Sequence, residues 1–172
     1  MPAAMTRSTT SRRRVLASLG AGIAAAAAGC TGSGGIDGKP AYEDGNMGEV
    51  NASNASNRTA AEMSAAEALA EQESNTSVTP LNSLSVADHE FVVEDGYLGA
   101  TVQGTVENTG SDRIQLAEVR TRVYNDAGDM LGQYLATTGD LNGGSTWEFQ
   151  VIILEPPADV ADYDITVLGT PS

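Results

Sequence analysis

Only two residues of this chain carry a thiol or an imidazole, Cys30 and His89, and each is the single residue of its type. A lone cysteine cannot form a disulfide within the chain, and this pair cannot supply the four nitrogen or sulfur ligands of a zinc site. The sequence also lacks the Gly-x-Ser-x-Gly pattern of a serine nucleophile beside which His89 could act as a base. We therefore expect a protein that is not an enzyme, with no catalytic residue, metal or cofactor, and a solvated His89.

Oxygen ligands are abundant, because 23 residues are Asp or Glu. Calcium prefers such ligands, and two groups of acids stand close in sequence: Asp126 with Asp129, and Asp159 with Asp162 and Asp164. Neither group follows the D-x-D-x-D-G spacing of a calcium loop. We expect a solvated acidic edge, with a divalent cation site as the alternative.

Cys30 stands at the end of a segment typical of an export signal. Residues 1–14 carry four arginines and no acid, and residues 15–29 are almost all Ala, Leu, Gly and Val. This apolar run is shorter than the roughly 20 residues of a spanning helix, so a cleaved signal peptide over residues 1–29 is favoured. Arg12 and Arg13 resemble the pair in a twin-arginine signal, which is a receptor-read address and not an anchor.

The neighbours of Cys30 favour a lipid anchor over the alternative, a buried unpaired thiol. Gly29 precedes it, and the following Thr-Gly-Ser-Gly-Gly stretch offers nothing to bury it. Because stable anchoring takes two acyl chains, we expect a glycerolipid on Cys30 of a lipoprotein that begins at this residue. The expected location is the cell membrane, lipid-anchored and facing the extracellular side, with the twin-arginine export machinery as one partner.

The chain is strongly acidic, with a net charge of −14. Without residues 1–29, five bases remain against 23 acids, a net charge of −18, and Lys39 is the single lysine. Such a composition resembles that of halophilic proteins, in which surface carboxylates maintain solubility. A basic partner is the alternative, but the Debye length of about 3 Å in molar salt removes long-range attraction. Nucleic-acid binding is excluded, because it needs clustered Lys or Arg.

Residues 30–80 are typical of a flexible, disordered tether, since Gly, Ser, Asn, Ala and acids dominate and large apolar residues are scattered. Within it, Thr59 and Glu62 have the spacing of a capping box, which predicts a helix from Thr59 toward Glu73 that frays for lack of an apolar stripe. The tether also holds four Asn-x-Ser/Thr sequons, which are candidate N-glycosylation sites of a glycoprotein. They lie at Asn51, Asn54, Asn57 and Asn75.

From residue 81 onward, apolar and polar residues alternate, as in strands with one buried face. The pattern predicts six or seven short strands, which indicate an all-β fold, a small antiparallel β-sandwich over residues 81–172. The expected runs are 84–86 with 91–93, 98–106, 114–124, 130–136, 147–153 and 163–167. Gly128 suits a left-handed turn position in the hairpin that follows residue 124.

Several side chains of these runs admit two interpretations. Trp147 and Phe149 alternate with polar residues, which favours burial in the core over a carbohydrate-stacking platform. Arg120 and Arg122 share an outward face with Glu118, opposite Val119, Thr121 and Val123. We expect both arginines to pair with carboxylates across strands, with a basic ligand-binding spot as the alternative.

Three stretches, residues 104–110, 119–128 and 147–149, together resemble the FxLYD domain of exported prokaryotic proteins, many of them haloarchaeal lipoproteins. The slots of the naming motif hold Thr121, Arg122, Val123, Tyr124 and Asn125, so only the tyrosine is retained, and another side chain must fill the core beside Thr121. The resemblance covers roughly residues 81–172. It implies an immunoglobulin-like sandwich and no catalytic residues.

Together these features predict a lipid-anchored cell-surface protein that presents a non-catalytic β-sandwich for binding, spacing or interaction with an extracellular protein or ligand at the envelope. The alternative is an accessory subunit of an envelope enzyme or transport complex that binds a divalent cation. A complex subunit could also pair through an exposed strand edge.

Overall fold

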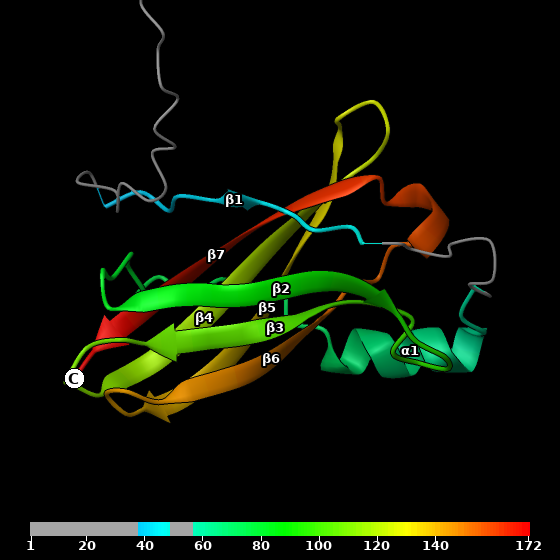
Figure 1. Cartoon of the computed structure of the whole chain (residues 1–172). Coiled ribbons are helices and arrows are strands. Elements are labelled where there is room, and N and C mark those ends of the chain that lie inside the picture. The colour runs from blue at the N-terminus through cyan, green and yellow to red at the C-terminus, as the bar shows by residue number, and fades with distance from the viewer. Residues whose placement is uncertain (1–37, 49–56) are drawn as a thin grey trace, which may run out of the picture. The chain divides into compact units, whose positions relative to one another are not determined.

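Two antiparallel sheets face each other in the computed structural model of this protein (Figure 1), which describes residues 38–48 and 57–172. The all-β sandwich expected from the sequence is confirmed. Its elements are β1 (Glu43–Asp44), α1 (Ala60–Leu69), β2 (Leu84–Val93), β3 (Ala100–Asn108), β4 (Ile114–Tyr124), β5 (Met130–Leu141), β6 (Thr146–Ile152), a 3-10 turn (Pro157–Asp159) and β7 (Asp162–Pro171).

One sheet has the strand order β1-β7-β4-β5 and is called sheet A here, and the other, sheet B, has the order β2-β3-β6. The core lies between them and is built from alternate residues of each strand. Phe149 is 4% exposed and buried as expected, while Trp147 is partly buried and packs against it, with the ring centroids 5.9 Å apart. Burial in the core is therefore confirmed for Phe149, whereas Trp147 packs at the margin of the core.

The strand β2 continues through residues 87–90, between the two parts of the first expected run, 84–86 with 91–93. The apolar residues Val86 and Phe91 are five positions apart, a spacing that simple alternation cannot place on one face. A register shift between Val86 and Asp88 in the pairing with β3 restores the parity. This β-bulge adds one residue to the strand and turns both side chains toward the core.

The hairpin between β4 and β5 closes as the sequence predicts. Gly128 has φ of +80°, in the left-handed region that favours glycine. The amide N–H groups of Ala127 and Asp129 donate to the side-chain oxygen of Asn125 at 3.0 and 2.9 Å. Asn125 therefore organises the turn through its own side chain, as Asn commonly does in turns.

Parts of the expected tether pack against the sandwich. Residues Glu43 and Asp44 pair with Ile165 and Asp164 of β7, and α1 begins with the predicted capping box of Thr59 and Glu62. The helix ends at Leu69 and not near Glu73. The described part of residues 30–80 thus differs from a free tether, because the pairing of β1 and the packing of Met47 and Ala70 against the core attach it to the sandwich. No helix within residues 38–48 and 57–172 is both long and apolar enough to cross a membrane.

Candidate functional site

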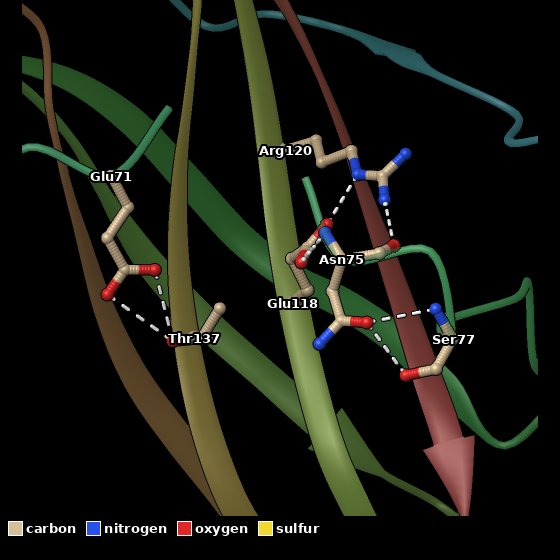
Figure 2. Close-up of polar contacts among 6 residues, drawn as sticks. All are labelled: Glu71, Asn75, Ser77, Glu118, Arg120 and Thr137. Carbon is tan, nitrogen blue, oxygen red and sulfur yellow. Dashed lines mark hydrogen bonds and ion pairs between the residues drawn. The ribbon is translucent and has the colours of Figure 1, made fainter. Parts of the chain in front are cut away.

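A group of polar contacts around the buried Glu118 lies on the outer face of sheet A, beneath residues 71–79. These residues, called the crossing segment here, run from the β5 edge across β4 to the β7 edge (Figure 2). Glu71 forms an isolated bridge with Leu135 on β5, and Thr79 forms one with Gly169 on β7. The segment therefore occupies one position on each edge of the three-stranded core of sheet A.

Beneath the middle of the crossing segment, Glu118 is paired with Arg120. The Arg120 Nε donates to Glu118 Oε1 at 2.5 Å, and the Glu118 side chain is 1% exposed. The Asn75 N–H donates to Glu118 Oε2 at 2.9 Å, and Arg120 Nη2 donates to the Asn75 carbonyl at 3.0 Å. Two charged side chains thus hold both main-chain polar groups of Asn75, and the Glu118 carboxylate is satisfied on both oxygens.

Arg122 follows on the same face and pairs across strands with Asp164, its register partner on β7. Its Nε donates to Asp164 Oδ1 at 2.7 Å, and Nη2 donates to Oδ2, a bidentate arrangement. Tyr42 covers the guanidinium, with Arg122 Cζ 3.6 Å from the ring centroid, a cation–π contact. The expected cross-strand pairing is confirmed for Arg122, whereas Arg120 pairs along its own strand.

Titration behaviour follows from these contacts. The hydrogen bond to Asp164 raises the pKa of Arg122, and burial raises the pKa of Tyr42 and of Tyr124. The Tyr124 hydroxyl donates to Asp164 at 3.1 Å. Arg122 therefore stays charged, and Tyr42 and Tyr124 stay neutral, near neutral pH.

His89 lies on β2, half-buried, where a solvated side chain was expected. Its Nδ1 is 2.7 Å from the hydroxyl of Tyr163, which also donates to the Asn46 carbonyl at 3.3 Å. Burial lowers the pKa of His89, opposed by the carboxylates of Glu43 and Asp88. Burial also raises the pKa of Tyr163 to about 12. This pair connects the two sheets beside β1 and is not arranged with any serine or cysteine among the described residues.

Arg58 fixes the beginning of α1 to the end of the sandwich. Its Nε donates to the Tyr97 carbonyl at 2.9 Å, and its Nη2 donates to the carbonyls of Leu98 and Ile153, the latter at 2.9 Å. A Cβ on Gly99, where φ is +52°, would lie 2.7 Å from Arg58 Cζ. Glycine at position 99 thus permits both the backbone conformation and the close approach of the guanidinium.

A surface pocket lies beside the β4–β5 hairpin and the start of β7. Its lining includes Asp126 and Asp162 from the two acidic groups, together with Tyr124, Asn125, Gly128 and Ala161. Asp164 is engaged with Arg122, and Asp162 accepts from the Tyr163 N–H at 2.8 Å. Within the described part of the chain, no three His, Cys, Asp or Glu side chains meet in an arrangement that could hold a metal ion.

The described residues include two of the four sequons. Asn57 and Asn75 are both exposed. The Ser77 hydroxyl donates to Asn75 Oδ1 at 2.7 Å, and the Thr59 hydroxyl donates to Glu62 at 2.8 Å. Other predicted site residues lie outside the described residues: Arg12, Arg13, Cys30, Asn51 and Asn54.

The burial of Glu118 is the feature that sequence reasoning missed. Alternation correctly places it opposite Val119, but the covering segment is distant in sequence. Its register partner Leu168 is 1% exposed, and Leu135, the partner of Arg120, is 2% exposed. These two leucines on an otherwise polar face were the available signal that something covers it.

Comparisons with known proteins give few matches. No family model matches the chain. The chain is similar to an uncharacterized protein of Methanocaldococcus jannaschii, MJ0360, with 29% identity over 86 residues. The match covers 49% of this chain and 63% of that protein, so the chain spans less than two thirds of the relative's length.

A solved structure also matches, that of a DUF1425 family member from Shewanella sp. PV-4. It has 14% sequence identity and a TM-score of 0.38, over 57% of this chain and 93% of that one. A likeness at this level carries no argument about function, and the sandwich described above follows from the strand pairing itself.

Proposed function

We propose that this protein is a lipid-anchored cell-surface protein whose β-sandwich binds or spaces a partner outside the membrane without catalysing a reaction. The order of Arg12-Arg13, an apolar run and Cys30 supports the anchor. The resemblance to FxLYD domains supports the same class. The acidic surface of the mature chain suits a high-salt exterior.

One observation carries the non-catalytic part of this proposal. The charged side chains gathered on the outer face of sheet A are engaged with one another and with main-chain groups. Glu118 and Arg120 hold Asn75, and Arg122 holds Asp164 in a bidentate pair. Groups that are saturated in this way act as structural contacts, whereas a catalytic acid or base needs a reachable proton of the substrate.

The pairing of β1 with β7 limits the reach of the proposed anchor. The chain between Cys30 and Glu43 can span at most about 45 Å. A tether from Cys30 to residue 80 would reach several times farther. The sandwich is therefore expected to stay close to the membrane surface, where a short-range contact and not a long stalk defines its role.

Mass spectrometry of the protein from its native membranes tests the anchor. The expected result is an N-terminus at Cys30 with a covalently attached glycerolipid. The variant Cys30→Ser should be released from the membrane fraction, and Arg12→Lys with Arg13→Lys should remain in the cytoplasm. An intact N-terminus at Met1 in the wild-type protein would refute the proposal.

A further inference from the structure

The crossing segment is attached to sheet A mainly through its main chain. Its ends are held by Leu135 and Gly169. Its middle is held by the Glu118–Arg120 pair (Figure 2). The contacts are Leu135 N–H to Glu71 O at 2.9 Å, Asn75 N–H to Glu118 at 2.9 Å, Arg120 to Asn75 O at 3.0 Å, and both Thr79 N–H to Gly169 O and Gly169 N–H to Thr79 O at 2.9 Å.

Side chains of the crossing segment contribute less. Val78 is buried, at 8% exposed, whereas the other residues from 71 to 77 are exposed. The Glu71 carboxylate accepts from the Thr137 hydroxyl at 3.1 Å, near the surface. The face of sheet A therefore holds the main chain of the crossing segment and one small β-branched side chain. The Asn75 side chain organises the turn at residues 76–77 by accepting from the Ser77 N–H at 2.9 Å.

The Glu118–Arg120 pair is the centre of this recognition. Glu118 accepts from the N–H of Asn75, and Arg120 donates to the carbonyl of Asn75. The pair thus binds both main-chain polar groups of one residue. A carboxylate that is 1% exposed needs such a donor, because an unsatisfied buried charge is costly. A peptide segment that crosses the face and turns directly after this residue offers both groups.

We propose that the outer face of sheet A is a binding surface for a peptide segment, occupied within the chain by residues 71–79 and open to an equivalent segment of another molecule when these residues detach. The partner is a peptide with a free N–H at its central residue, a turn directly after that residue and a Val-like side chain three residues after it. The inference rests on the proposed function, since it names a partner class for that binding role.

The tethered segment competes strongly with any incoming peptide. A covalently linked ligand acts at an effective concentration in the millimolar range. The wild-type chain therefore binds a free peptide weakly, and weakening the internal contacts raises the apparent affinity.

The test uses the full chain purified in detergent and a fluorescent synthetic peptide identical to residues 70–80. The double variant Asn75→Pro with Thr79→Pro removes two N–H donors of the internal segment. It should bind the peptide saturably and at least about tenfold more tightly than the wild-type chain does. Saturable binding by neither protein, with the variant folded by circular dichroism, would overturn the inference.

Two matched peptides identify the recognised group. A peptide with Pro at the position of Asn75 should bind the double variant at least about tenfold more weakly, because it lacks the N–H that Glu118 accepts. A peptide with Ser at that position keeps the N–H and a side-chain oxygen that can hold the following turn, and it should bind within about threefold of the original. Equal loss with both peptides would show side-chain recognition and refute the backbone-reading surface.

Hydrogen exchange of the wild-type chain decides the question if the double variant does not fold. The amides of Leu135 and Gly169, which donate to the crossing segment, should exchange through a local opening. Amides of the ladder between β4 and β7 should exchange more slowly. Equal protection at both places would mean that the segment does not detach.

None of these measurements depends on the lipid. Failure of the peptide-binding inference therefore leaves the anchoring proposal standing, and failure of the anchoring proposal leaves these measurements valid.

Discussion

Glu118 and Arg120, two positions apart on β4, form an ion pair in which the carboxylate is 1% exposed and the guanidinium 15% exposed. Residues on one strand face at this spacing usually meet solvent together. Here the crossing segment covers both, and the pair becomes part of the interior.

Removing the cation of this pair should therefore be costly. We expect Arg120→Met to lower the free energy of unfolding by about 3–5 kcal/mol, because Glu118 is left buried without its partner. The second change Glu118→Gln should restore part of the loss, since the amide oxygen can still accept from Asn75. Urea denaturation of the variants measures both effects.

Arg113 provides the matched control for that experiment. It pairs with Asp140, but the two side chains are 47% and 70% exposed. Arg113→Met should cost less than about 1 kcal/mol, as exposed pairs do. A similar cost for Arg113 and Arg120 would contradict the burial of the Glu118 pair.

Thr121 offers a substitution that should stabilise the protein. Its hydroxyl is buried in the core without a hydrogen-bond partner. Thr121→Val should raise the free energy of unfolding by about 1–2 kcal/mol, because the desolvation cost of the hydroxyl disappears. Thr101 is equally buried, but its hydroxyl donates to the Val92 carbonyl at 3.3 Å. Thr101→Val should therefore not stabilise, and thermal melting of the two variants separates the cases.

The guanidinium of Arg58 should not be replaceable by the ammonium group of a lysine. Arg58→Lys keeps the charge but loses the planar fork that donates to Tyr97, Leu98 and Ile153. We expect a loss of about 2 kcal/mol in unfolding free energy, from part-buried carbonyls left without donors. Faster hydrogen exchange in α1 would accompany it. An unchanged melting temperature and exchange pattern would show that α1 does not depend on this contact.

His89 should make stability depend on pH. Because burial lowers its pKa below the usual value of about 6.5, the folded state prefers the neutral ring. Its contribution is present above pH 6.5 and is lost as pH falls. The difference in melting temperature between wild type and His89→Gln should decrease from pH 8 to pH 5. A constant difference over this range would place His89 in solvent.

Local patterns in the sequence predicted much of the fold, because local interactions determine those elements. Alternation identified the strands, Gly128 marked the hairpin, and the spacing of Thr59 and Glu62 marked the start of α1. The core beside Thr121 is filled as expected by another side chain, since its register partner Tyr134 is 2% exposed.

The candidate site was not predictable in the same way. Glu118 is buried by residues more than forty positions earlier, through main-chain contacts that leave no side-chain pattern. The β-bulge in β2 changed the parity on which alternation depends. Both features arise from pairing between distant segments, about which periodicity within one segment carries no information.

The short β1 has a mechanical consequence. Any pull transmitted along the chain from its N-terminal side reaches β1 before it reaches the sandwich. The two paired residues, the contact of Tyr42 with Arg122 and the main-chain hydrogen bonds of Gly45 and Asn46 resist it there. The ladder between β4 and β7, in contrast, extends along the full length of both strands. Under load β1 should therefore yield first. Release of residues 42–46 frees roughly 50 Å of chain before Arg58 is loaded, so the protein would lengthen at low force while the sandwich stays folded.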